Sequence, residues 1–258
     1  MAAGALAGLG PGRWRWAFWA VGGLCVLWAL VMQLLMRDTP QPVADGEPKA
    51  TLREGFAALL KKPTAVLIAV AFGMFMYVMC GFRLWAVTFL VRSFEGVSLA
   101  SAAFHAVFWY YLGALVGLVV SSRALDFLGR RSKTVRLDAS ILGLVLSVVP
   151  MYAVSSATSL AACCLWLLVL GLTCGLYEAG HYPSMFDCIV PRYRSVATGL
   201  TGCLAFAVGS LAPAALGWIH DAFSLRLGMA TLSVFFLLGA LILLPARLFT
   251  FKRDLVSQ

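Results

Sequence analysis

The sequence has little charge. Only 12% of its 258 residues are Asp, Glu, Lys or Arg, whereas 62% are hydrophobic. A soluble globular chain has about a quarter charged residues, so this chain has too few polar groups to cover a surface that faces water. Lipid is the solvent that suits such a composition, which therefore predicts an integral membrane protein.

The sequence also lacks the patterns of enzymes and metal sites. Its three histidines, His105, His181 and His220, fall in separate segments, and the motifs H-E-x-x-H and G-x-S-x-G are missing. None of the seven cysteines belongs to a C-x-x-C pair or a metal-ligand spacing. We therefore expect no enzyme activity, no metal site and no cofactor. The net charge of +9 does not indicate nucleic acid, because the basic residues lie between apolar runs and form no single basic face.

Apolar runs are what the sequence has in abundance. A helix needs about 20 mostly apolar residues to cross a bilayer, and seven stretches satisfy that requirement. The fold class they predict is an all-α polytopic membrane helix bundle of about seven transmembrane helices. The predicted spans are 14–36, 65–91, 101–122, 134–153, 159–182, 195–219 and 225–249.

The stretch between the first two spans has a different character. Pro40, Gly46 and Pro48 give its first part the composition of a linker. In its second part, 51–62, leucines and a phenylalanine recur at helical spacing among charged residues, which predicts a short amphipathic helix on the membrane surface. The predicted domains are an N-terminal transmembrane helix, a linker with a surface helix, a six-helix bundle and a tail, at 1–36, 37–62, 63–250 and 251–258.

The positive charges predict the orientation. Fifteen of the twenty Lys and Arg residues lie in the connections and span ends on one side, and four lie on the other. Because cytoplasmic loops are rich in Lys and Arg, we expect the linker and the C-terminus in the cytoplasm and the N-terminus outside. We expect a multi-pass protein of the plasma (inner) membrane. Arg13 and Arg15 lie at the outer end of the first span, against the rule, so we expect Met1 to be an internal start or a truncation.

The connection after the third span, 122–133, reads SRALDFLGRRSK. It resembles the loop signature G-x-x-x-D-R-x-G-R-R of the major facilitator superfamily, with Asp126, Gly129, Arg130 and Arg131 in register. Ser122 and Phe127 replace the first Gly and the first Arg of that signature. The segment 182–199 is similar to the connection between the tenth and eleventh helices in organic-anion and sugar-acid symporters of the superfamily.

The layout resembles the C-terminal part of such a transporter: its sixth helix, its central linker and its helices seven to twelve. The resemblance implies secondary transport of a small solute by alternating access, with H+-coupled symport as one form. Helices one to five have no counterpart, so the implied partners are, besides the solute and membrane lipids, a missing N-terminal bundle or a second copy. One alternative is a truncated, non-transporting half. A remote alternative is a seven-helix receptor.

Charges inside the predicted spans are functional candidates, because a membrane makes them costly. Arg83 lies about 27 Å above the cytoplasmic end of its span, with Met76 and Met79 on the same face. The guanidinium fork suits a carboxylate or a phosphate, so Arg83 is predicted to bind an anionic group of the solute, with Met76, Met79 and Tyr177 beside it. The alternative is that Arg83 reaches to the outer membrane interface.

Resemblance to the family implies that Asp126, Gly129, Arg130 and Arg131 form a cytoplasmic latch, in which Gly129 permits a tight turn. The alternative is that the arginines anchor the loop to lipid phosphates. Glu178 is an acid within a predicted span, and two hypotheses stay open for it. It either joins the latch or carries a coupling proton together with His181. On the predicted spans it lies about 20 Å from Arg83 in depth, so we do not expect the two to pair.

Small residues predict where helices approach closely. Gly113 and Gly117 are four residues apart, as are Gly171 and Gly175, and a further run of glycines is Gly199, Gly202 and Gly209. Glycines at such spacing let two membrane helices come into backbone contact. All seven are therefore predicted to lie at helix contacts.

Overall fold

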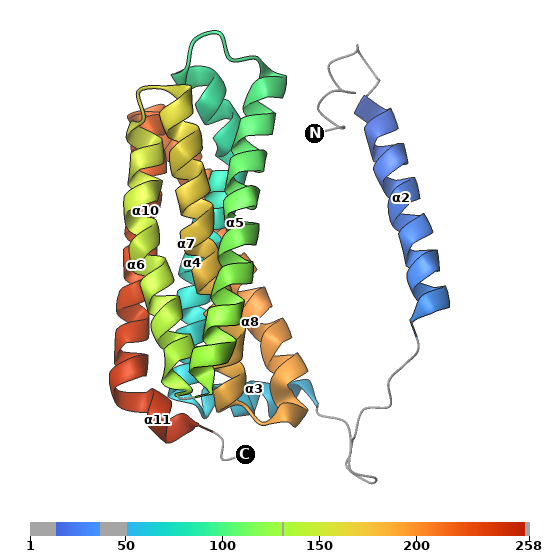
Figure 1. Cartoon of the computed structure of the whole chain (residues 1–258), viewed down its shortest axis with the longest axis vertical. Helices are drawn as coiled ribbons and strands as arrows, with labels where there is room; N and C mark the ends of the chain where they lie inside the picture. The colour runs from blue at the N-terminus through green and yellow to red at the C-terminus, as the bar shows by residue number, and fades with distance from the viewer. Residues whose placement is uncertain (1–13, 37–50, 131, 256–258) are drawn as a thin grey trace.

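The structure is a computed structural model that describes residues 14–36, 51–130 and 132–255. All regular elements in these ranges are helical (Figure 1). In chain order they are α2 (Trp14–Leu35), α3 (Leu52–Leu60), α4 (Pro63–Ser93), α5 (Leu99–Gly129), α6 (Thr134–Ser156), α7 (Leu160–Cys188), the 3-10 turn η1 (Pro191–Tyr193), α8 (Arg194–Gly209), α9 (Leu211–Ala222), α10 (Leu225–Pro245), the π-helical turn η2 (Ala246–Thr250) and α11 (Phe251–Asp254).

Seven stretches of the described chain are long and apolar enough to cross a membrane. Each overlaps one predicted span, which confirms the all-α polytopic bundle. Two helices run further than predicted: α5 continues to Gly129 and α7 to Cys188. The prediction ended α7 before Pro183, but the helix continues with Pro183 inside it, as membrane helices commonly do when neighbouring groups replace the lost hydrogen bond.

The longer α7 changes the position of Glu178. Ten residues separate it from the end of α7, which corresponds to about 15 Å along the axis. Glu178 therefore lies near the middle of its helix and not at its end, as the predicted span implied.

Glycines hold α5 and α7 in backbone contact. A Cβ atom added at Gly171 would lie 2.1 Å from the carbonyl oxygen of Tyr110. One added at Gly113, Gly117 or Gly175 would lie 2.1–2.6 Å from the backbone of the opposite helix. The predicted contacts of these four glycines are confirmed, and they explain how two helices of this length pack side by side (Figure 1).

The opposite side of α7 packs equally closely on α6. A Cβ at Gly180 would lie 2.3 Å from the carbonyl oxygen of Arg136, and one at Gly143 would lie 2.6 Å from the amide nitrogen of Tyr177. Thus α7 is in backbone contact with two neighbours at once.

The glycine run of α8 behaves differently from the prediction. Gly209 contacts α4, with a hypothetical Cβ 3.0 Å from the carbonyl oxygen of Met76. No heavy atom would lie within 4 Å of a Cβ at Gly199 or Gly202. The prediction is confirmed for Gly209 and wrong for Gly199 and Gly202, because the buried face of α8 consists of Ala197, Thr201, Ala205 and Gly209, and the other two glycines lie off that face.

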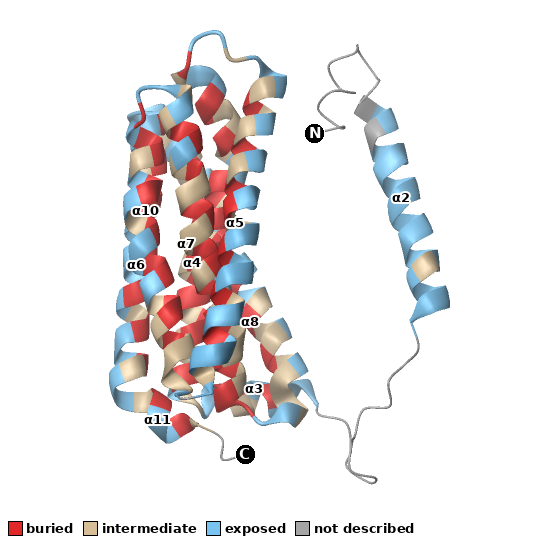
Figure 2. Cartoon of the chain, in the orientation of Figure 1, coloured by how far each residue is buried: buried red, intermediate tan, exposed pale blue. Residues whose placement is uncertain are grey.

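Buried positions line the interior of the bundle (Figure 2). At its centre the ring of Phe75 on α4 lies 4.5 Å from that of Tyr177 on α7 and 6.1 Å from that of Phe236 on α10. Helix α4 is buried on most sides, and between Thr64 and Leu90 only Arg83 and Leu84 are exposed.

Helix α3 is the predicted amphipathic helix. Thr51 and Glu54 form a capping box, in which each side chain accepts the backbone N–H of the other residue, at 3.3 and 3.1 Å. Gly55 packs against the side chain of Val196 on α8. The apolar side chains left exposed lie on one face: Leu52, Phe56 and Leu60.

Helix α2 stands apart from the other helices in Figure 1. Its side chains are exposed along nearly the whole described length (Figure 2). An apolar helix with every side exposed needs lipid or protein around it.

Candidate functional site

Arg83 lies on the outward face of α4. Its side chain is exposed, and its guanidinium carbon lies 5.8 Å from the centre of the Tyr111 ring on α5. This is a cation–π distance. The contact holds the guanidinium against α5 and leaves its N–H groups open to the face that α4 and α5 share.

Glu178 on α7 is exposed as well, and its charge interacts with that of Arg83. The charges of both residues also act on Tyr110 and Cys174. The Arg83 guanidinium lies over Tyr111, and the adjacent Tyr110 carbonyl faces Gly171, seven residues before Glu178, so about 10 Å of depth separates the two charges. This is less than the predicted depth because Glu178 lies near the middle of α7, but the two still do not pair. Among the described residues, neither side chain forms an ion pair with the other or with a third residue.

Three residues predicted to bind the solute beside Arg83 are buried. Met76, Met79 and Tyr177 are 6%, 0% and 1% exposed. Tyr110 on α5 covers Met79 and donates its hydroxyl hydrogen to the Met79 sulfur at 3.1 Å. In this conformation these three belong to the core, because α5, α7 and α8 cover the face of α4 that helical spacing alone would leave open.

His181 is buried one turn along α7 from Glu178. Its ring stacks on Phe72 at 4.3 Å, and its Nδ1 lies 3.3 Å from the Tyr177 hydroxyl oxygen. Its Nε2 is buried and has no hydrogen-bond partner within the described part of the chain. His181 and Glu178 are three residues apart on α7 but have different surroundings. Aromatic rings surround His181, whereas Glu178 is exposed.

The residues of the family loop end up at the end of the bundle that carries α3 and α11, which we call the α3 end (Figure 1). Asp126 and Arg130 are exposed there and have no ion-pair partner among the described residues. Arg131 lies outside the described residues. Gly129 ends α5 without the left-handed backbone that a tight turn would use. A Cβ at Gly129 would lie 3.4 Å from the Nε of Arg136, which is an ordinary contact, so packing does not require glycine at this position.

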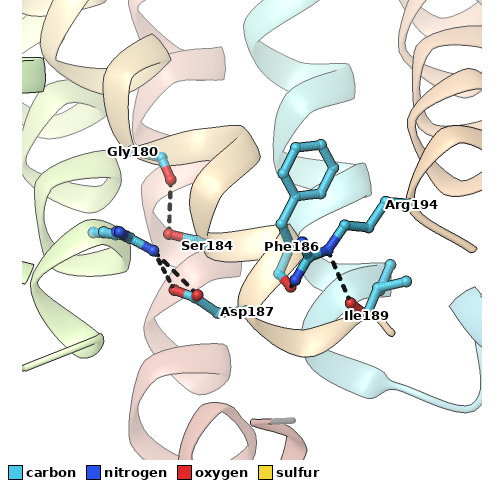
Figure 3. A network of polar contacts seen from close by, with 7 residues as sticks. Gly180, Ser184, Phe186, Asp187, Ile189 and Arg194 are labelled. Carbon is cyan, nitrogen blue, oxygen red and sulfur yellow. Dashed lines mark hydrogen bonds and ion pairs between the residues drawn. The ribbon is translucent and has the colours of Figure 1, made fainter. Parts of the chain in front are cut away.

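Sequence reasoning missed the contacts that do join helices at the α3 end. Arg136 on α6 donates to both carboxylate oxygens of Asp187 on α7, at 3.1 Å each (Figure 3). Asp187 is 6% exposed. Seven residues further along the chain, Arg194 at the start of α8 donates to the carbonyl oxygens of Phe186 and Ile189, at 2.9 and 3.2 Å. The available signal was an Asp and two Arg near the ends of neighbouring spans.

The C-terminal segment is tied to the start of α4 in a similar way. The backbone N–H of Thr64 donates to the Asp254 carboxylate at 3.0 Å, and the Lys62 ammonium donates to the Asp254 carbonyl oxygen at 3.0 Å. Asp254 is buried, so it supplies the helix cap that α4 lacks locally. An ion pair between Arg247 and Asp138 fixes η2 to α6.

The comparisons with known proteins bear on this geometry. The family model described as Major Facilitator Superfamily matches residues 1–137, which is more than half of the chain. The chain belongs to the major facilitator superfamily. No curated protein matches it.

Solved structures of the superfamily share the fold. A bacterial homolog of the human lysosomal transporter Spinster, in an inward-facing and unoccupied conformation, matches with a TM-score of 0.70 and 20% identity over 95% of this chain and 61% of that one. Its occupied form gives 0.66 at 20% identity, covering 95% and 60%. The E. coli fucose:proton symporter FucP gives 0.63 at 10% identity, covering 90% and 54%. The chain thus spans less than two thirds of the length of these transporters.

Proposed function

We propose that this superfamily member forms part of a secondary transporter that moves a small organic solute across a membrane by alternating access. The observation that carries the proposal is Arg83: a guanidinium within a span, exposed and without an ion-pair partner among the described residues. A charge at such a place is costly unless it serves a ligand or a pathway. Two bundles rocking around a site near the midplane would expose it to each side in turn.

The class of solute follows from the chemistry of Arg83. Its planar fork binds a carboxylate or a phosphate with two parallel hydrogen bonds, and the Tyr111 ring holds it in place. We therefore propose an organic anion or sugar acid as substrate. Met76, Met79 and Tyr177 would contribute only if the helices over them move.

The missing half of the pathway is the second part of the proposal. On this view α2 is the sixth helix of the family, 37–62 is the central linker, 63–250 is the C-terminal bundle and 251–258 is a tail. An N-terminal bundle or a second copy would cover the face that carries Arg83. The linker and C-terminus would lie in the cytoplasm of a plasma (inner) membrane, and the N-terminus outside.

Coupling and gating are assigned to separate groups. Glu178 is proposed to carry a coupling proton, since it is an exposed acid well inside a membrane span, and His181 is its candidate partner. Asp126, Arg130 and Arg131 are proposed to form the latch, with lipid phosphates as the alternative partners of the arginines. Glu178 is left out of that latch because of its mid-helix position.

Uptake into liposomes tests the proposal. The 258-residue chain is reconstituted, and entry of labelled gluconate, lactate and glycerol phosphate is measured for the wild type and for Arg83→Gln. We expect Arg83→Gln to lower uptake at least about tenfold, because a hydrogen bond to a charged group contributes roughly 1.5–3 kcal/mol. Arg123→Gln is the matched control, since Arg123 is also exposed on a helix but lies at the far end of α5.

The outcomes separate the competing readings. If Arg83→Gln leaves the uptake of every anion unchanged, the assignment of Arg83 is wrong. If the wild type takes up none of them alone but does so with an added N-terminal bundle, the chain is a half that needs its partner. If neither preparation transports any of them, the organic-anion assignment is wrong.

A further inference from the structure

Two opposite charges share the open face of the bundle without meeting. Arg83 on α4 and Glu178 on α7 are both exposed. The Arg83 guanidinium lies over Tyr111, and the adjacent Tyr110 carbonyl faces Gly171, seven residues before Glu178, so the two charges are about 10 Å apart along the helix axes. No guanidinium nitrogen lies within 4.0 Å of a Glu178 carboxylate oxygen, which is the distance that defines an ion pair. Opposite charges at membrane depth normally pair with one another. A ligand that carries a negative and a positive group would pair with both of these charges at once.

The two ends of this gap have different chemistry. At one end Arg83 offers only donors, and Tyr111 keeps the guanidinium in place. At the other end Glu178 offers only acceptors when ionised, and its charge acts on the half-buried ring of Tyr182, one turn along α7. A carboxylate next to an aromatic ring is a favourable setting for an ammonium group.

Tyr110 forms no hydrogen bond with Arg83 or Glu178. Tyr110 is 2% exposed, and both charges act on it, yet its hydroxyl donates to the Met79 sulfur. Cys174, also reached by both charges, is fully buried and lies in contact with Ser147. Neither side chain bridges Arg83 to Glu178, so the two charges stay available to a ligand.

We propose that the Arg83–Glu178 face selects a zwitterionic solute, whose carboxylate or phosphate binds Arg83 and whose ammonium group binds Glu178. This inference rests on the proposed transport function and refines its substrate class. A purely anionic solute at Arg83 would leave the Glu178 carboxylate near it as a repulsive charge. A zwitterion of equal size pairs with both charges and brings no net charge into the membrane.

The variant Glu178→Gln separates the two proposed roles of Glu178, which are proton carrier and ammonium-binding group. Glu178→Gln resembles the protonated acid in shape and hydrogen bonding. If Glu178 only carries a proton, Glu178→Gln still binds an anion at Arg83. If Glu178 binds an ammonium group, Glu178→Gln loses the zwitterion, while Glu178→Asp retains part of its affinity.

The experiment uses the full chain in lipid nanodiscs and measures ligand-dependent thermal stabilisation. The probes are matched triplets in which one skeleton carries both groups, the acid alone or the amine alone: alanine, lactate and ethylamine, and phenylalanine, phenyllactate and phenethylamine. Phosphocholine, inorganic phosphate and choline form a third triplet. Glu95→Gln and Arg123→Gln serve as controls that remove an exposed charge elsewhere.

We expect the zwitterion of at least one triplet to bind at least about tenfold more tightly than its acid or its amine. Arg83→Gln and Glu178→Gln should each weaken it by about tenfold to a hundredfold, as expected for one charged hydrogen-bonded contact. The controls should bind it like the wild type. If the acids bind as tightly as the zwitterions and Glu178→Gln does not weaken them, the zwitterion site is refuted while anion transport stands. If no probe stabilises the wild type, both proposals fail.

Discussion

Replacing Gly171 with alanine should force α5 and α7 apart. The new methyl group would lie 2.1 Å from the Tyr110 carbonyl oxygen, and an ordinary contact begins at 3.4 Å, so the helices must separate locally by about 1.3 Å. The obstacle is backbone and cannot rotate away, which places the strain near the upper end of the roughly 1–3 kcal/mol typical of overpacking. The gain in helix propensity from Gly to Ala, up to about 1 kcal/mol, offsets part of it. We expect a net loss of about 2 kcal/mol.

The chain offers a matched control at Gly199. That residue is also helical, but no heavy atom lies within 4 Å of its hypothetical Cβ. Gly199→Ala should be neutral or stabilise the protein by up to about 1 kcal/mol. Unfolding of the purified chain by SDS in mixed micelles, followed by far-ultraviolet circular dichroism, would give both values. Equal stability of the two variants would refute the reasoning, because it would mean that α5 and α7 are not in backbone contact.

A second variant tests the shared origin of the strain. A Cβ at Gly171 would also lie 3.0 Å from the carbonyl carbon of Gly113, so the two glycines face each other. Once one alanine has separated the helices, the second meets more room. Gly113→Ala combined with Gly171→Ala should therefore lose less stability than the sum of the single variants, by at least about 0.5 kcal/mol. Strict additivity would argue that the two sites are independent.

Two further predictions concern the α3 end, and the same unfolding assay checks both. Arg136→Gln should destabilise the protein by about 3 kcal/mol because it leaves the buried Asp187 carboxylate unpaired, and adding Asp187→Asn should restore part of that loss; a double variant as unstable as the sum would contradict the pairing. Asp254→Ala should cost about 1–2 kcal/mol because the Thr64 N–H loses its acceptor, and Asp254→Asn should cost less because an amide oxygen can still accept. Equal losses for the two Asp254 variants would mean that the cap contributes little.

The number and order of the helices could be predicted from the sequence because lipid imposes a simple rule. Each span must be apolar over about 20 residues, and the seven that satisfy this overlap the helices observed. Helix ends were harder to predict, because α5 and α7 continue past the apolar part into polar turns. Hydropathy reports where a helix lies in lipid and contains no signal for how far it extends beyond.

The sequence could indicate which residues are candidates for the site, but not which of them lie close together in the fold. Arg83 stood out because a charge within a span is rare, and it is exposed in the structure. Met76 and Met79 share its helical face by spacing, but burial depends on which neighbouring helix covers each turn, and spacing cannot report that. The Arg136–Asp187 pair was missed because it joins residues 51 positions apart, and only the fold brings them together.

The two-sided packing of α7 has a consequence for motion. Backbone meets backbone on one side at Gly171 and on the other at Gly180, so rotation of α7 against either neighbour would drive main chain into main chain. Helices α5, α6 and α7 should therefore move as one rigid block. The contact of α8 with α4 is less tightly interlocked, since only one of the three glycines in α8, Gly209, meets the main chain of a neighbouring helix. Any bending that opens or closes a path through this protein should begin at α8.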